Sequence, residues 1–427
     1  MARIRLAAFF ATLATLALLP SATASAAPAV NGVFDLSGAP GQLTEGPDGN
    51  IWITLSGSGL GNDLAKVTPQ GTVTEFDPAD VTGPIGIAAG DDGNLWVTQA
   101  GGVAKVPPAN PTGATKFAIA AIADPRGITA GPDGNLWTAS GDKVLRIPPA
   151  DPANPTPFPV AGMGARGITA GPDLIWVADF AGQRIISLNT DGTAITPFFP
   201  VGGGPQEVVA SSGAQVAYSN PGDDPQNVGR ITPGGSPLLT PTPLNDPFGL
   251  AFGADGAYWV AQFAAGNLGR LTTAGAFTTL GGLPAASGPR YLTAGPGNTL
   301  WVGLEIAQKV ARVSGLEPPT PPTPPTPKAP ETEITSGPKG KLKAGKRGAK
   351  ARFKFNSSPA GATFECSLKK KGKRNAREKK LAKFKNCKSP KRYKRLRPGR
   401  YKFRVRATLA GVADPTPAKA AFQVKRR

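Results

Sequence analysis

The residue types present restrict the chemistry open to this chain, because its 427 residues include no histidine. That excludes Ser-His-Asp and Cys-His nucleophile systems, histidine general bases and histidine metal ligands. The only cysteines are Cys366 and Cys387. Adjacent carboxylates occur at 91–92 and 223–224, but neighbours in a strand face opposite ways and neighbours in turns are usually solvated. The sequence therefore predicts no catalytic residue and no metal site.

Other carboxylates recur at a fixed place in a repeated phrase that ends in tryptophan. The phrase reads Gly-Pro-Asp-Gly-Asn-Leu-Trp at 131–137, and its copies place all six tryptophans, at positions 52, 96, 137, 176, 259 and 301. A seventh copy lies at 211–218, where Ala217 takes the tryptophan position. Repeats of roughly 40–45 residues with turn and strand signals indicate the four-stranded blades of a β-propeller. The repeated aspartates are expected to hydrogen-bond the local backbone of a hairpin turn, and they are Asp48, Asp92, Asp133, Asp173 and Asp255.

The elements that position these groups are short strands. We expect residues 27–316 to form a seven-bladed β-propeller, with each tryptophan buried between blades. The last copy ends near residue 313 without a fourth strand, whereas Ala29–Leu36 is strand-like and otherwise unassigned. We therefore expect the chain start to supply the outer strand of the last blade and so to cover an exposed edge.

A second domain is expected after a Pro/Thr-rich linker at 317–330, which favours polyproline II and acts as a spacer. Residues 331–427 contain several short alternating runs, which are typical of a small β-sandwich. The fold class is thus all-β, a seven-bladed propeller followed by a small sandwich. Cys366 and Cys387 both lie in this second domain. In an exported chain a disulfide is the default interpretation, and the alternative of metal-bound thiolates lacks the other ligands that zinc needs.

The first 26 residues have the features of a secretory signal peptide. Arg3 and Arg5 precede an apolar run at 6–19, and small residues at 24–26 form a cleavage site. The run is shorter than the ~20 residues that cross a bilayer, and no later stretch is long enough. We expect a secreted or cell-envelope-associated protein without a transmembrane segment.

The charge of the chain is divided between its two parts. Residues 328–427 hold 33 Lys and Arg against five Asp and Glu, so the net charge of +20 combines a basic part of +28 with an acidic remainder of −8. Part of the basic charge lies in an insertion between the cysteines, Lys369–Lys385, which is either a solvated loop or a polyanion-binding patch. No nucleic-acid fold signature accompanies this charge, so anionic cell-envelope polymers are favoured over nucleic acid as the partner of residues 331–427.

Both parts resemble known families. The phrases at 126–137 and 269–272 resemble the virginiamycin B lyase (streptogramin lyase) propellers, and the resemblance covers about residues 40–316. The phrases at 363–368 and 403–408 resemble the immunoglobulin-like or fibronectin-type repeats of exported bacterial proteins. The first resemblance implies a seven-bladed propeller that opens cyclic streptogramins by elimination with a magnesium ion.

The lyase resemblance also implies two groups in the site, a histidine before a Gly-Ile step and a glutamate that closes the tryptophan strand. The histidine position holds, from the first copy to the seventh, Gly41, Ile85, Arg126, Arg166, Gln206, Phe248 and Arg290. The glutamate position holds Leu55, Gln99, Ser140, Asp179, Asn220, Gln262 and Leu304. Only Asp179 is acidic, so neither family role is matched.

Both sets of positions are expected to face the mouth of a central channel, where polar anchors would form a binding site. The candidates for ligand binding are Arg126, Arg166, Arg290, Gln99, Gln206, Gln262 and Asp179. The alternative is that the arginines are simply solvated on loops.

Together these features favour an exported, non-catalytic ligand-binding or scaffold propeller, held at anionic surfaces by its basic domain. Its expected ligand is an unknown small molecule or glycan, and no cofactor is predicted. The alternative is a carbon–oxygen lyase acting on cyclic depsipeptides with a carboxylate in place of the histidine. Mg²⁺ would be needed only in that alternative.

Overall fold

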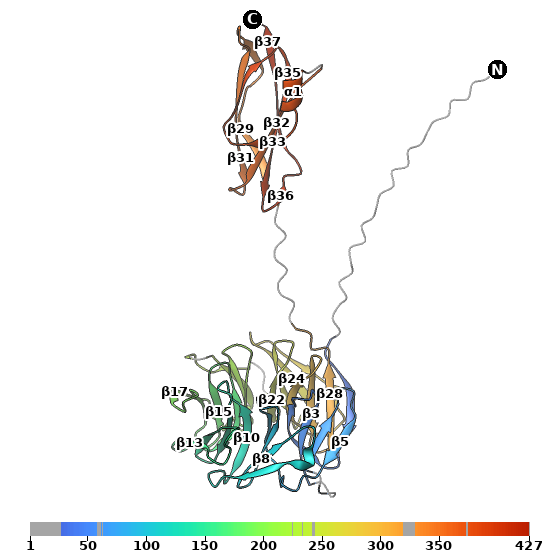
Figure 1. The fold of residues 1–427 in the computed structure, drawn as a ribbon, viewed down its shortest axis with the longest axis vertical. Helices are drawn as coiled ribbons and strands as arrows, with labels where there is room; N and C mark the ends of the chain where they lie inside the picture. The colour runs from blue at the N-terminus through green and yellow to red at the C-terminus, as the bar shows by residue number, and fades with distance from the viewer. Residues whose placement is uncertain are drawn as a thin grey trace, which may run out of the picture. The chain divides into compact units, whose positions relative to one another are not determined.

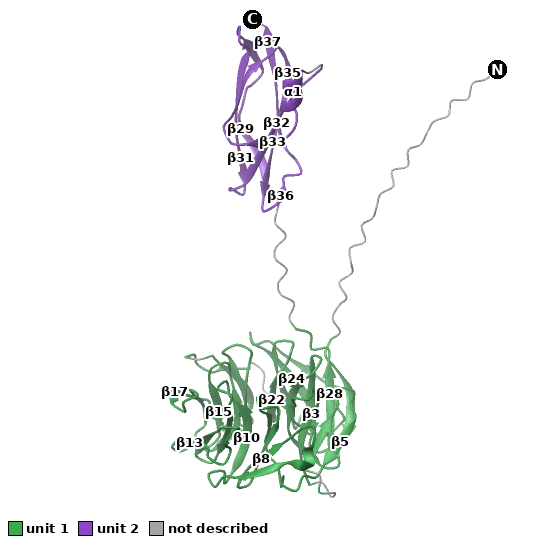
Figure 2. Cartoon of the chain, viewed as in Figure 1, with its two compact units in different colours: residues 1–319 green, residues 320–427 purple. Residues whose placement is uncertain are grey.

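The computed structural model describes residues 27–57, 61, 63–223, 225–232, 234–240, 244–318, 329–372 and 375–426. The expected signal peptide and most of the expected linker lie outside the described residues. The chain divides into two compact units, residues 1–319 and 320–427, here called the propeller unit and the sandwich unit (Figure 2). Nearly all described elements are strands, so the all-β fold is confirmed. In the described part of the chain, no helix is long and apolar enough to cross a membrane.

The propeller unit consists of seven four-stranded antiparallel sheets, which are the predicted blades (Figure 1). The first blade is β2 (Ala39–Glu45), β3 (Ile51–Ser56), β4 (Leu64–Val67) and β5 (Val73–Phe76). The second is β6 (Ile87–Ala89), β7 (Leu95–Gln99), β8 (Gly102–Val106) and β9 (Thr115–Ala118), with a short 3-10 turn (Pro111–Gly113) before β9. The third is β10 (Pro125–Ala130), β11 (Leu136–Ser140), β12 (Lys143–Ile147) and β13 (Thr156–Pro159).

The other four blades follow the same order. The fourth is β14 (Ala165–Ala170), β15 (Ile175–Asp179), β16 (Arg184–Leu188) and β17 (Ala194–Pro200). The fifth is β18 (Glu207–Ala210), β19 (Val216–Asn220), β20 (Asn227–Ile231) and β21 (Leu238–Leu239). The sixth is β22 (Pro247–Phe252), β23 (Ala257–Gln262), β24 (Asn267–Thr272) and β25 (Phe277–Leu280). The seventh is β26 (Pro289–Gly295), β27 (Thr299–Leu304), β28 (Lys309–Ser314) and the chain start β1 (Ala29–Asp35).

The first strands of the blades form a closed ring. Each first strand contacts that of the next blade, and β26 of the last blade contacts β2 of the first. The ring is also closed by sequence, because β1 pairs with β28 and places Phe34 opposite Val310. The predicted closure by the N-terminal strand is confirmed, and it pairs the outer edge of the last blade.

The tryptophans form the core between blades, as predicted, and each is at most 2% exposed. Five of them pack against a phenylalanine of the outer strand of the same blade, with ring centroids 5.6–6.0 Å apart. In the last blade that phenylalanine is Phe34 of β1, which stacks on Trp301. The closing strand therefore supplies the aromatic that the other blades take from their own fourth strand. In the fifth blade Ala217 occupies the tryptophan position, and Tyr218 beside it is buried.

The repeated aspartates have a role beyond the predicted bond to the backbone. In the third blade Asp133 Oδ1 accepts a hydrogen bond from the backbone of Asn135 and a second one, at 3.0 Å, from Trp137 Nε1. The same indole bond occurs at Asp48, Asp92 and Asp255. Since a buried indole N–H needs an acceptor, each aspartate both shapes the hairpin turn and satisfies the tryptophan core.

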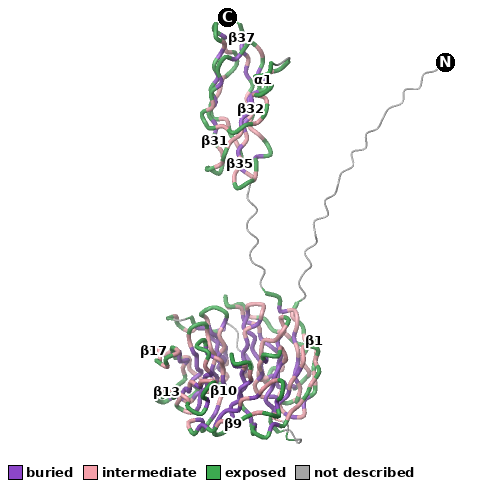
Figure 3. The backbone as a smooth tube through the Cα atoms, viewed as in Figure 1, coloured by how far each residue is buried: buried purple, intermediate pink, exposed green. Residues whose placement is uncertain are grey.

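The sandwich unit has two packed sheets. The three-stranded sheet is β29 (Glu331–Ser336), β31 (Ala349–Ser358) and β34 (Lys391–Leu396). The six-stranded sheet has, in order, β30 (Lys341–Ala344), β37 (Ala418–Arg426), β35 (Gly399–Leu409), β32 (Thr363–Lys370) and β33 (Lys385–Cys387), with β36 (Val412–Ala413) on β35. Between them lies an aromatic core in which Phe353 and Phe403 stack with centroids 3.9 Å apart. Figure 3 shows the buried residues along these strands.

The predicted disulfide is present, with Cys366 of β32 bonded to Cys387 of β33. The segment between the cysteines is not simply a solvated loop, because it contains the helix α1 (Ala376–Leu381). The helix begins at a capping box in which Asn375 and Glu378 bond each other's backbone. Glu378 also pairs with Lys370 at 3.2 Å. Part of this basic insertion is therefore folded onto the sheet.

Candidate functional site

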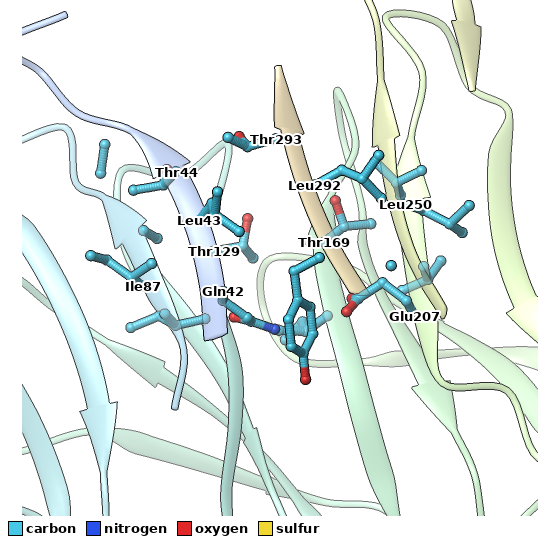
Figure 4. Close-up of a pocket in the computed structure, with 18 of the residues that line it drawn as sticks. Gln42, Leu43, Thr44, Ile87, Thr129, Thr169, Glu207, Leu250, Leu292 and Thr293 are labelled. Carbon is cyan, nitrogen blue, oxygen red and sulfur yellow. The ribbon is translucent and has the colours of Figure 1, made fainter. Parts of the chain in front are cut away.

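A central channel runs through the ring of first strands. Residues from the first strand of every blade line a cavity of about 350 Å³ there. Figure 4 shows that the Gln42 amide and the Glu207 carboxylate reach into it from opposite strands. The wall is otherwise built mainly of small or apolar side chains such as Thr129, Thr169 and Leu250. The channel is therefore a concave site with few polar groups, which is the usual composition of a small-molecule pocket.

A second cavity, of about 130 Å³, adjoins the channel where the first strands begin, and the two share Gln42, Glu207 and Tyr291. Six of the seven residues at the family histidine position line it: Ile85, Arg126, Arg166, Gln206, Phe248 and Arg290. The seventh position is Gly41, which has no side chain to contribute. The structure thus brings the three arginines and Gln206 together at one end of the channel, which we call the arginine mouth.

The three arginines differ in their partners. Arg126 lies 2.9 Å from Asp124, and Arg290 lies 2.6 Å from Glu305 and 4.2 Å from the ring of Phe248. Arg166 has no carboxylate partner among the described residues, and its guanidinium lies 5.0 Å from the ring of Phe180. Burial and the neighbouring charge of Arg126 lower the pKa of Arg166. An anion placed beside Arg166 would relieve both effects.

Two of these arginines also carry buried donors that have no acceptor. The Nε atoms of Arg126 and Arg290 are shielded from solvent and make no hydrogen bond within the described residues. Unpaired buried donors are unfavourable, and a ligand oxygen would satisfy them.

The position after the arginine mouth explains the shape of the channel. It holds glycine in four blades, at Gly86, Gly127, Gly167 and Gly249, and Gln42, Glu207 and Tyr291 in the others. A Cβ on Gly167 would lie 2.3 Å from Glu207 Oε1, and a Cβ on Gly86 would lie 3.1 Å from Gln42 Oε1. The glycines therefore leave the room that the Gln42 and Glu207 side chains occupy. These channel residues were missed in the sequence, although this pattern of four glycines was available to find them.

Glu207 is the carboxyl group that lines both cavities, and no ion pair to it is found in the described part of the chain. It is half-buried, since part of its surface reaches the channel. Burial raises the pKa of Glu207 from its ordinary value of 4.5 to about 8. At neutral pH the group is therefore protonated and donates a hydrogen bond, and it does not cancel the charge of the arginines.

The residues at the family glutamate position lie elsewhere. Gln99, Gln262 and Asp179 are buried and line neither of the two cavities. Gln99 bonds the backbone of Asp80 and Thr82, and Gln262 bonds Asn267. Asp179 accepts from the backbone of Gly164 and Gly182 and pairs with Arg184 at 2.6 Å. These three side chains stabilise the loops of their own blades and are not brought to the arginine mouth.

The donor set of the channel does not fit a magnesium ion. Mg²⁺ is held in proteins by carboxylate and other oxygen ligands in near-octahedral geometry. Here one carboxyl group, which is protonated at neutral pH, lies next to three guanidinium groups. In the described residues no group of three or more acidic or cysteine side chains is placed to hold a metal.

Comparison with known families agrees with this geometry of the ring. The sequence profile of the virginiamycin B lyase family matches residues 30–234, 82–280 and 156–351, which together span more than half of the chain. The chain belongs to the virginiamycin B lyase family. No curated protein matches the chain in sequence.

Solved structures of this family share the fold. The virginiamycin B lyase of Staphylococcus aureus is 20% identical with a TM-score of 0.58, covering 66% of this chain and 98% of the lyase. A catalytically inactive histidine-to-alanine variant of the S. aureus enzyme, solved with quinupristin, is also 20% identical, with a TM-score of 0.57 and coverage of 66% and 99%. Hydrazine synthase of Kuenenia stuttgartiensis is 16% identical, with a TM-score of 0.55 and coverage of 65% and 96%. At these identities the similarity establishes the propeller fold alone.

Proposed function

We propose that the protein is an exported, non-catalytic binding protein whose propeller takes a small molecule or glycan carrying an anionic group. The observation that carries this proposal is the arginine mouth. Three guanidinium groups converge there, one of them without a carboxylate partner in the described residues, while the nearby Glu207 is protonated at neutral pH. Tyr291, Gln42 and Glu207 supply hydrogen-bonding groups just inside the channel.

The histidine-free composition supports a non-catalytic role. The S. aureus lyase is inactive after a histidine-to-alanine change, whereas this chain contains no histidine at all. The expected signal peptide and the disulfide support export, since disulfides persist in oxidising compartments. The basic sandwich unit would then hold the propeller at anionic cell-envelope polymers, to which its charge is complementary.

Family membership favours the second candidate, a carbon–oxygen lyase acting on cyclic depsipeptides. Asp179 cannot provide the missing base, because it is buried and paired with Arg184. Glu207 is the carboxyl group placed at the channel, and its raised pKa would suit a general base. The poor fit of Mg²⁺ to this site leaves binding as the better supported function.

Ligand binding at the arginine mouth is tested by calorimetric titration with pairs of small molecules that differ only in an anionic group. We expect the anionic member of a pair to bind and the Arg166→Gln variant to lose tenfold or more in affinity, equivalent to about 1.4 kcal/mol. Lys116→Gln removes one positive charge from the exposed outer strand β9 and should leave the affinity unchanged. Equal losses in both variants, or equal binding of neutral and anionic members, would contradict the proposal.

A further inference from the structure

A row of basic side chains lies along β35 on the outer face of the six-stranded sheet. Its members are Arg400, Lys402, Arg404 and Arg406. They alternate with the buried residues Tyr401, Phe403, Val405 and Ala407, most of which belong to the core of the sandwich. Alternate side chains of a strand share a face, so all four cations lie on the face opposite the core, about 7 Å apart along the strand.

The neighbouring strands add charge of the same sign. Lys369 of β32 lies directly opposite Lys402, and Lys419 of β37 lies directly opposite Arg404. Like charges in directly opposed cross-strand positions destabilise a sheet. The one carboxylate carried by these three strands is Glu365, which pairs with Arg406 at 2.6 Å. The face thus concentrates positive charge that its own residues do not neutralise.

We propose that this β35 row is the docking surface for a linear phosphodiester polymer of the polyol phosphate type, lying extended along the strand. This inference rests on the proposed role of the sandwich unit as a tether. Two residues of a strand contain six backbone bonds, and so does one repeat of a glycerol phosphate chain, so successive phosphates match successive members of the row. Arginine also binds phosphate oxygens in a bidentate manner.

The same face disfavours single-stranded nucleic acid as the occupant. Proteins that bind single strands combine a basic groove with exposed aromatic rings on which bases stack. Here Tyr401, Phe403 and Phe422 are buried in the core. The ring of Phe384 has guanidinium groups at 4.9 Å from Arg404 and 4.6 Å from Arg406, so it is covered by the row itself. A polymer without bases therefore fits the surface better.

The test compares two full-length variants that each lose four positive charges. The row variant carries Lys369→Gln, Arg400→Gln, Lys402→Gln and Lys419→Gln, which have no printed role in the core and are all exposed. The control variant carries Lys350→Gln, Arg352→Gln, Lys354→Gln and Arg392→Gln on the outer face of the three-stranded sheet. Poly(glycerol phosphate) and single-stranded DNA of equal charge are the two probes, titrated from 50 to 300 mM salt. Melting curves confirm that both variants are folded.

We expect the row variant to lose at least tenfold in affinity for poly(glycerol phosphate), and the control variant to lose much less. The slope of log affinity against log salt should fall by about 3 for the row variant, as for four lost phosphate contacts on a single strand. Equal losses in both variants would overturn the docking surface and leave the tether intact. Tighter binding of DNA would overturn the polyol phosphate class. No salt-sensitive binding by the unmodified protein would overturn the tether itself.

Discussion

At the residue scale, the functional part of the channel depends on two consecutive positions of the first strand. The first position forms the arginine mouth, and the second alternates between glycine and the long side chains of Gln42, Glu207 and Tyr291. Family phrases locate the first position in every blade, so the sequence predicted that ring. The glutamate position was misjudged, because it closes a strand that turns into a loop, where Gln99 and Asp179 bond the backbone.

The titration of Glu207 gives a prediction about stability. Its pKa of about 8 in the folded protein exceeds its ordinary value of 4.5, so the folded state binds more protons than the unfolded state between these pH values. The stabilisation is complete below pH 4.5 and is lost as pH rises through about 8. Relative to Glu207→Gln, the unmodified protein should lose roughly 1–3 kcal/mol between pH 5 and pH 9, discounted for water in the channel.

Urea unfolding followed by tryptophan fluorescence at several pH values measures this difference. Glu317→Gln removes an exposed carboxyl group of the same unit and should leave the pH profile of the unmodified protein unchanged. If Glu207→Gln shows the same pH profile as the unmodified protein, the carboxyl group is ionised in the channel and the assignment of charge at the mouth is wrong.

At the element scale, the blades are interchangeable in outline and differ in where their fourth strand comes from. The sequence predicted this because the tryptophan phrase marks each second strand, and because the strand at Ala29–Leu36 resembles the outer strand of the first blade. It did not predict the indole bonds of Asp48 and its equivalents, since those depend on the fold of the hairpin in three dimensions. Nor did it predict helix α1, which is short and begins inside a basic segment.

The closing strand gives a second prediction. Phe34→Ala removes the ring that stacks on Trp301, and the half-buried side chain should cost about 2 kcal/mol, below the range for fully buried phenylalanines. Val33→Ala on the same strand alters a side chain that is 38% exposed and should cost much less. Thermal unfolding measures both. Equal effects would show that β1 adds little to the closure of the ring.

The disulfide gives a third prediction, confined to the sandwich unit. Cys366 and Cys387 are 21 residues apart, and closing a loop of that size stabilises the folded state by about 3 kcal/mol in the chain-entropy model. Changing both cysteines to alanine should lower one of two unfolding transitions and leave that of the propeller unit unchanged. Intact mass with and without reductant checks the bond in the starting protein. A single transition shifted as a whole would contradict the independence of the two units.

At the scale of the whole molecule, the chain combines an acidic propeller with a strongly basic sandwich. The sequence showed this division through composition alone, and the fold adds where the charge lies, in rows on the strands of the sandwich unit. The identity of a ligand could not be predicted, because the shape of the channel depends on side chains contributed by seven separate repeats.

The central claim is that this member of the virginiamycin B lyase family binds through its channel without catalysing ring opening. The direct measurement is incubation of the purified protein with a cyclic streptogramin B and Mg²⁺, followed by mass spectrometry for the linear product, with the protein-free mixture as background. The account predicts no linear product above background, because no histidine is present and the channel does not fit the metal. Turnover that Glu207→Gln abolishes would contradict the account and would establish an enzyme in which a carboxylate acts as the base.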